Sequence, residues 1–214
     1  MNQHSTIHYL KILLFTALVV CSFFVPMSAQ TAKAEGDARA GNISAFNEQF
    51  SGYPSNWTVF KGNWTYGGGV VRGLGKSYDW GEIYYRRSTY RNLDYQVRMR
   101  RVGCSTCANS IRFRDSGSFS GVFSYTNSGT YTIGKEVGTN WQSWINWQPT
   151  SAIYRGGWNT LCVKAVGDTY WFYINNRLVA SGYKSGLNSG FVGIEHYSYT
   201  SAGNFLDVDW AVLR

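Results

Sequence analysis

The sequence predicts an all-β fold, an antiparallel β-sandwich or jelly roll, on three observations. Of the 214 residues, 17% are aromatic, only 15% are charged and 24 are glycine. Apolar and polar residues alternate with a period of two over many short segments, which is typical of strands with one buried face. Turn-forming glycine and asparagine separate these segments, and good helix formers are too sparse for a long helix. The aromatic content also excludes a disordered chain.

Residues 1–34 have the features of a signal peptide. An apolar run over residues 12–25 follows Lys11, and it is too short to span a bilayer, which takes about 20 residues. The small-x-small pattern of a signal-peptidase site follows at residues 32–34. We expect cleavage there and secretion to the extracellular space or periplasm, with an uncleaved N-terminal anchor as the alternative.

The remaining chain predicts a short flexible lead-in, residues 35–44, and one jelly-roll domain, residues 45–214. It has no second long apolar run, so we expect no membrane insertion after cleavage. Loss of residues 1–34 lowers the net charge from +8 to +6. A basic exported chain without an RNA-binding signature predicts no nucleic-acid partner, and the oligomeric state is left open.

The strands can be placed in order from the alternation. In residues 95–100, tyrosine, valine and methionine alternate with glutamine and two arginines. Asn127-Ser-Gly129 marks a hairpin turn between two later strands. The segments with this pattern are 95–100, 110–114, 121–125, 130–133, 159–166, 169–174, 177–180, 190–194 and 205–212. We expect about ten to twelve strands in all and no major helix.

Three cysteines follow the predicted cleavage site. Cys104 and Cys107 lie in a polar turn between two predicted strands, and an exported chain permits disulfides, so we predict a local disulfide between them. A redox CxxC pair would instead begin a helix in a βαβ unit. Cys162 lies in an apolar strand and is expected to be a buried free thiol.

Several short motifs occur in a fixed order along this domain. They are Asn56-Trp-Thr-Val59, Gly62-Asn-Trp64, Asp94-Tyr-x-Val-x-x-Arg100, Phe113-Arg114, Gly129-Thr-Tyr-Thr-Ile-Gly-Lys135, Gly157-Trp-Asn-Thr160, Tyr173-Ile-Asn175 and Ser189-Gly-Phe-Val-Gly193. Their order resembles the concanavalin A-like lectin/glucanase superfamily, and within it bacterial laminin-G-like and 3-keto-disaccharide hydrolase-type domains. The resemblance implies a concanavalin-like antiparallel β-sandwich, in a family of mixed functions.

Catalytic chemistry has weak support in the sequence. Glycoside hydrolysis usually needs two carboxylates facing the scissile bond, and the resemblance implies a Glu-x-Asp-x-x-Glu run on one strand. The nearest approach is Asp79-Trp-Gly-Glu82, which lacks the first glutamate, so Glu82 is the weak candidate. Asp207 and Asp209 share one face of the last predicted strand and are interpreted as solvated.

The other catalytic and metal-binding arrangements are equally weak. There is no Gly-x-Ser-x-Gly elbow, and His196 is the only histidine left to act as a base after cleavage. It is also the only histidine left for zinc. Some relatives use calcium, but no Asp-rich loop stands out, so no metal or cofactor is predicted and Ca²⁺ stays open.

Binding chemistry is better supported. Sugars present apolar C–H faces edged by hydroxyl groups, so aromatic plates beside polar groups suit them. Trp141, Trp144 and Trp147 fall within seven residues, and strand parity puts the first and last on one side and Trp144 on the other. Trp80 and Tyr84, with Tyr85 beside them, form a second aromatic cluster. Either set can instead be core.

Four arginines lie on the polar sides of two consecutive predicted strands. They are Arg98 and Arg100 on one, and Arg112 and Arg114 on the next. If the strands pair as a hairpin, the guanidinium groups form one basic patch suited to carboxylate or sulfate groups. The alternative is a solvated face whose arginine stems cover apolar surface.

We therefore predict a secreted, non-catalytic, carbohydrate-binding, lectin-like module, with an acidic polysaccharide as a candidate ligand. Replacing Trp144 or Arg112 by alanine would then abolish binding. The first alternative is a glycoside or 3-keto-glycoside hydrolase. The second is an extracellular protein-binding or adhesion domain.

Overall fold

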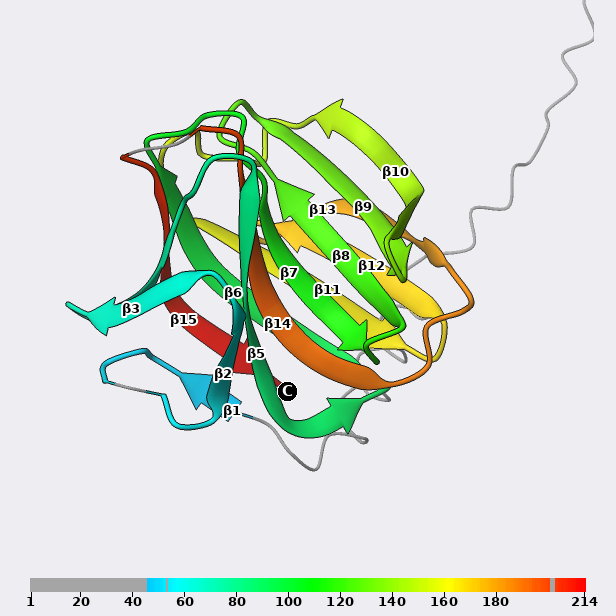
Figure 1. The fold of residues 1–214 in the computed structure, drawn as a ribbon. Coiled ribbons are helices and arrows are strands. Elements are labelled where there is room, and N and C mark those ends of the chain that lie inside the picture. The colour runs from blue at the N-terminus through cyan, green and yellow to red at the C-terminus, as the bar shows by residue number, and fades with distance from the viewer. Residues whose placement is uncertain (1–45, 53, 201–202) are drawn as a thin grey trace, which may run out of the picture.

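The computed structural model describes residues 46–52, 54–200 and 203–214. The predicted signal peptide and lead-in, residues 1–44, lie outside this part. The described residues form fifteen strands in two antiparallel sheets and no helix (Figure 1). The all-β sandwich is therefore confirmed, with more strands than the ten to twelve expected. No helix long and apolar enough to cross a membrane occurs among the described residues.

One sheet has eight strands, and its order is β13-β12-β11-β6-β15-β4-β3, with β1 paired to β15. The strands are β1 (Phe46–Glu48), β3 (Asn63–Gly67), β4 (Val70–Leu74), β6 (Leu93–Val102), β11 (Asn159–Val166), β12 (Thr169–Ile174), β13 (Arg177–Tyr183) and β15 (Phe205–Leu213). Its outer face is turned away from the second sheet.

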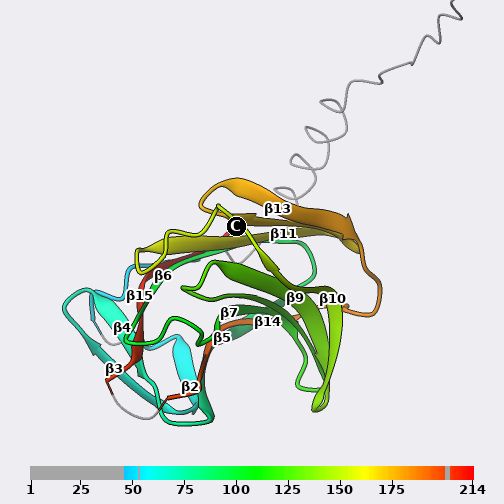
Figure 2. The same ribbon diagram turned by 90° about the horizontal axis from the view of Figure 1, so that it is seen from above.

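The second sheet has seven strands in the order β10-β9-β8-β7-β14-β5-β2. They are β2 (Trp57–Lys61), β5 (Asp79–Tyr90), β7 (Asn109–Asp115), β8 (Phe119–Tyr125), β9 (Thr130–Val137), β10 (Asn140–Pro149) and β14 (Gly190–Ser198). This sheet is strongly curved, and its concave side, the hollow face, is turned away from the eight-stranded sheet (Figure 2).

The hydrophobic core fills the space between the two sheets. On β6, buried residues alternate strictly with half-buried ones, so that Tyr95, Val97 and Met99 are fully buried. Ile111 and Phe113 of β7 are also fully buried and belong to the same cluster. The period-two pattern therefore identifies the core face of β6 correctly.

The predicted disulfide between Cys104 and Cys107 is confirmed, and Cys162 is a buried free thiol, as expected. The disulfide lies in the connection from β6 to β7, which crosses from one sheet to the other. The two strands therefore do not pair as a hairpin, which was the condition for a single arginine patch. β6 pairs with β11 and β15, and β7 pairs with β8 and β14. Strands that face each other across a sandwich carry the same alternation as strands that pair edge to edge, so the pattern could not distinguish the two.

Candidate functional site

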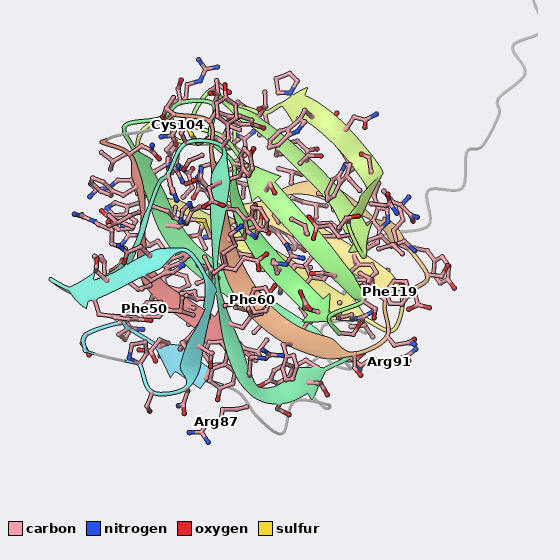
Figure 3. The ribbon with its side chains drawn as sticks, in the orientation of Figure 1. Phe50, Phe60, Arg87, Arg91, Cys104 and Phe119 are labelled. Atoms are coloured by element: carbon pink, nitrogen blue, oxygen red, sulfur yellow. A yellow bond between two sulfur atoms is a disulfide. The ribbon has the colours of Figure 1, made fainter. Side chains whose placement is uncertain are left out.

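The hollow face carries a cavity of about 450 Å³. Aromatic, acidic and basic side chains of β2, β5, β7, β9 and β14 make up most of its wall. They are Phe60, Trp80, Glu82, Tyr84, Arg86, Arg112, Asp115, Glu136, Phe191, Glu195 and Tyr197, with Gly117, Gly138 and Thr139 at one end. Phe60 belongs to β2, the edge strand of the curved sheet (Figure 3). The cavity is the best-supported place for a ligand among the described residues.

The guanidinium group of Arg112 lies at the base of this cavity. Its Nη1 donates to Glu82 at 3.0 Å and also to Glu195. Its Nε donates to Asp115 at 3.3 Å, and its Nη2 donates to Glu136. All three nitrogens are thus engaged by carboxylates from four different strand positions, and the arginine holds these acids together.

A glycine makes room for this arrangement. Gly193 of β14 pairs with Arg112 on one side and with Tyr84 on the other. A Cβ atom at this position would lie 2.7 Å from the ring of Tyr84, so a side chain here would displace it. The Tyr84 hydroxyl donates to Asp115 Oδ2 at 2.9 Å, while the backbone N–H of Gly117 donates to Oδ1 at 2.8 Å. Asp115 is therefore fixed from three directions.

Glu82 is the most perturbed acid of the group. Burial raises its pKa to about 7, and the nearby carboxylates of Glu195 and Glu136 act in the same direction, against the attraction of Arg112. Glu82 and Glu195 are direct register partners and both accept from Nη1 of Arg112. Near neutral pH Glu82 therefore holds a proton for part of the time. Burial also raises the pKa of Tyr84, so its hydroxyl stays a neutral donor.

Aromatic rings form the walls above these acids. Phe60 is 66% exposed and Trp80 is 40% exposed, so both present ring surface to solvent. The ring of Phe60 meets Tyr84 edge to face, with 6.0 Å between centroids. Lys61 lies over Trp80, with its Nζ 2.9 Å from the ring centroid, and also pairs with Asp79. Apolar plates and polar groups thus occur in one cavity.

The structure brings four of the predicted site residues together here: Trp80, Glu82, Tyr84 and Arg112. Tyr85 instead packs on the core side against Phe46, with 4.2 Å between ring centroids. This is the expected consequence of strand parity, because adjacent residues of β5 point to opposite faces.

The tryptophans of β10 divide as their parity predicts. Trp141 is 44% exposed and Trp147 is 48% exposed, whereas Trp144 packs against the core. Trp141 pairs in register with Glu136, which lines the cavity, so it stands beside the hollow on the same face. Trp144 contacts Tyr170 at 5.3 Å between centroids. Replacing Trp144 by alanine therefore tests folding. The expectation that this change would abolish carbohydrate binding by removing a contact with the ligand needs revision.

The four arginines do not form one patch. Arg98 and Arg100 lie on the outer face of the eight-stranded sheet, beside Trp158. The guanidinium carbon is 5.0 Å from the centroid of the Trp158 ring for Arg98 and 4.7 Å for Arg100. Arg112 belongs to the hollow face. Arg114 is buried between the sheets and donates to the Tyr170 hydroxyl and to the backbone oxygens of Leu187, Arg91 and Gly167. A positive φ of 51° at Arg114 and a register shift beside it turn its side chain inward.

The last strand also differs from expectation. Asp207 is buried, and it accepts hydrogen bonds from Arg72 at 2.6 Å and from Arg100 at 3.1 Å. Its interpretation as a solvated residue is therefore wrong. Asp209 is partly exposed and pairs with Arg98. These ion pairs hold β4, β6 and β15 together across the outer face, away from the hollow.

His196 lies between the sheets rather than in the hollow. It is 1% exposed, and its ring is 5.2 Å from that of Trp64. Burial lowers its pKa to about 3, so it stays neutral at physiological pH. No group of three or more His, Cys, Asp or Glu side chains is placed to hold a metal ion in the part of the chain that the structure describes.

Several residues of the cavity were not identified from the sequence. They are Phe60, Arg86, Asp115, Glu136, Phe191, Glu195 and Tyr197. They come from five strands, and their meeting depends on strand order. A pattern-based signal exists only within one strand, such as the spacing of Trp80, Glu82 and Tyr84 on one side of β5.

Comparison with known proteins gives a fold but no close relative. No family model and no curated protein sequence matches the chain. A β-glucanase from Bacillus licheniformis superposes with a TM-score of 0.65 at 12% identity, over 80% of this chain and 99% of its own. The carbohydrate-binding module CBM66 from Bacillus subtilis gives a TM-score of 0.58 at 18% identity, over 76% and 94%. A laminarinase from Flavobacterium sp. UMI-01 gives 0.61 at 10% identity, over 78% and 98%.

Identities this low establish shared architecture only. The neighbours include both enzymes and a binding module, so the architecture leaves catalysis open. The two curved and packed sheets, their order and these superpositions together place the chain in the concanavalin A-like jelly-roll fold.

Proposed function

We propose that the chain is a secreted, non-catalytic carbohydrate-binding module whose hollow face takes up a glycan. The observation that carries the proposal is the cavity of about 450 Å³, in which exposed rings stand above a fixed group of hydrogen-bonding side chains. Sites for organic ligands combine apolar walls with a few placed polar groups in this way. The superposition with a carbohydrate-binding module and with glucanases supports the same ligand class.

The rings and the acids have separate roles in this proposal. Phe60 and Trp80 offer exposed aromatic surface to the C–H face of a sugar ring. The carboxylates accept hydrogen bonds from sugar hydroxyl groups. Because Arg112 fixes the acids before a ligand arrives, little conformational entropy is lost on binding.

The state of the carboxylates favours binding over hydrolysis. A glycosidase pair is about 5–5.5 Å or 6.5–9.5 Å apart, so that the scissile bond fits between the groups. Glu82 and Glu195 instead accept from the same nitrogen of Arg112, which lies between them. A sugar therefore has no space between them unless the cluster opens.

The acidic polysaccharide expected from the arginines has little support at the hollow. All three nitrogens of Arg112 are already engaged by carboxylates, and Arg114 is buried between the sheets. Arg98 and Arg100 are more accessible, on the opposite side of the molecule beside Trp158. An acidic ligand would therefore bind at that outer face.

A glycan array probed at low and high salt tests the proposal. We expect binding by the wild type and at least a tenfold loss in Trp80→Ala, which removes an exposed ring from the hollow. Tyr183→Ala is the matched control, because Tyr183 is an exposed ring on the edge strand β13 of the other sheet. Equal loss in both variants, or a flat array with every glycan, would overturn the proposal.

Hydrolysis is the second candidate, and one observation favours it. A glutamate whose pKa is raised to about 7 can act as a general acid near neutral pH, and Glu82 lies inside the cavity. Incubation of the purified protein with β-glucans and with 3-keto-glycosides would show it. Turnover that disappears in Glu82→Gln would establish the enzyme and refute the non-catalytic proposal.

A further inference from the structure

We propose that the hollow face selects a cationic amino sugar, such as the glucosamine units of deacetylated chitin. This inference rests on the proposed glycan-binding function and names the ligand class of the same site. It follows from the distribution of charge in the cavity, from the engagement of its central arginine and from the exposure of one carboxylate.

The charge of the cavity is opposite to that of the protein. Four carboxylates line it, from Glu82, Asp115, Glu136 and Glu195, against the guanidinium groups of Arg112 and Arg86. The chain as a whole carries +8. Protonation of Glu82 still leaves three carboxylates for two arginines. An anionic glycan would therefore meet net repulsion here, and a cationic one net attraction.

The position of Arg112 leaves this excess open to a ligand. Its side chain is 8% exposed, compared with 34% for Glu136, and every one of its nitrogens is engaged by a carboxylate. Arg86 lies to one side, with its guanidinium 5.0 Å from the ring of Phe191. Arg112 is thus saturated by carboxylates, and the exposed Arg86 is held against Phe191 at the side of the cavity.

Glu136 is the carboxylate that a ligand reaches first. Its side chain is 34% exposed, compared with 7% for Glu82 and 13% for both Asp115 and Glu195. It comes from β9, whose neighbour β10 places the half-exposed Trp141 in register with it. A carboxylate beside exposed rings suits a sugar that carries an ammonium group on an otherwise apolar ring face.

A matched pair of ligands isolates the ammonium group. Glucosamine hexasaccharide and N-acetylglucosamine hexasaccharide have the same length and linkage and differ only at the sugar nitrogen, which is an ammonium group in the first and a neutral acetamide in the second. Isothermal titration at pH 6 and low salt should show the glucosamine hexasaccharide binding at least tenfold more tightly, with a preference that shrinks as salt is added. Non-specific attraction cannot produce this preference, because protein and ligand are both cationic overall.

Matched variants locate the effect. Glu136→Gln keeps the side-chain volume and should weaken binding of the glucosamine hexasaccharide about fivefold or more, with little effect on the acetylated one. Asp209→Asn removes one partly exposed, arginine-paired carboxylate on the other sheet and should leave both affinities unchanged. Urea unfolding of each variant verifies that it is folded.

The outcomes separate the two proposals. Equal or tighter binding of the acetylated hexasaccharide or of neutral glucans would overturn the amino-sugar inference and leave glycan binding intact. The amino-sugar inference would also be overturned if the preference for the glucosamine hexasaccharide survived in Glu136→Gln and disappeared in Asp209→Asn. The ammonium group would then be bound on the outer face. Binding of no glycan in the panel would refute both proposals.

Discussion

Arg112 of β7 hydrogen-bonds to Glu82 of β5 at 3.0 Å across the intervening strand β14. Gly193 of β14 lies in register between Arg112 and Tyr84, and a Cβ atom there would meet the ring of Tyr84. The central ion cluster of the hollow face thus joins side chains from four strands, β5, β7, β9 and β14. It links the stability of the curved sheet to the chemistry of the cavity.

Arg112→Met should destabilise the protein strongly at neutral pH. The change leaves four carboxylates close together without their shared cation, and three of them are largely buried. Breaking a buried ion pair in this way costs about 3–5 kcal/mol. Urea unfolding at pH 7.5 measures the loss, which should shrink at pH 5, where Glu82 is protonated.

Arg98→Met is the control for that experiment. Arg98 pairs with Asp209 on the outer face, where both side chains are about a third exposed. An exposed pair contributes about 1 kcal/mol or less. Equal losses of unfolding free energy in the two variants would contradict the conclusion that Arg112 stabilises the cluster of carboxylates in the hollow.

Glu82→Gln should change how stability depends on pH. The pKa of Glu82 is about 7 in the folded protein and about 4.5 without its surroundings. Between these values the folded state keeps a proton that the unfolded state has lost, so stability falls as pH rises from 4.5 to 7. Glutamine does not titrate, and the variant should therefore gain about 3 kcal/mol relative to wild type across this window.

Free energies of unfolding at half-unit pH steps, measured for both proteins, give the difference directly. A difference that stays constant between pH 4.5 and 7 would show that the Glu82 carboxyl titrates normally. A difference of opposite slope would mean that ionised Glu82 is favoured by Arg112 more than it is penalised by burial.

Trp144→Ala should lower stability, and Trp147→Ala should not. Trp144 packs against Phe113, Tyr170 and Phe172, whereas Trp147 is about half exposed. Truncating the packed ring leaves a cavity that costs about 3–5 kcal/mol when the site is fully buried, and somewhat less here. Thermal unfolding of both variants checks this, and similar melting temperatures would refute the assignment of faces on β10.

Gly81→Ala should be poorly tolerated, although its backbone conformation is ordinary for a strand. A Cβ atom there would lie 2.5 Å from Nε2 of the buried His196, which is confined by Trp64. Overpacking of this kind costs about 1–3 kcal/mol. Gly67→Ala is the control, since nothing lies within 4 Å of its Cβ position. Chemical denaturation that ranks Gly67→Ala as the worse variant would contradict the packing described around His196.

The sequence predicted the fold class well because alternation reports burial directly. On β6 every expected core residue is buried, and the order of short motifs indicated the correct fold. The expected number of strands was too low because the N-terminal strands and β5 were missed. In these segments aromatic and charged residues mix without strict alternation. Register shifts beside Lys61 and Val192 interrupt the period there.

The site was predicted only where one strand carries it. Trp80, Glu82 and Tyr84 share a face of β5, and parity is visible in sequence. The acids that surround Arg112 come from other strands, and their meeting depends on which strands are neighbours. Arg114 shows where parity fails as a guide to the face of a strand. Its own backbone is left-handed, and this turns its side chain from the expected face into the core.

The most direct test of the account follows the indole N–H signals of isotope-labelled protein by NMR during titration with the best ligand from the glycan array. Trp80 lines the hollow, and Trp158 lies beside Arg98 and Arg100 on the outer face of the other sheet. Glycan binding in the hollow predicts a saturable shift of the Trp80 signal, assigned through Trp80→Phe, with the Trp158 signal unmoved. Shifts confined to Trp158 would place the glycan on the arginine-bearing face and contradict the assignment of the hollow as the binding site.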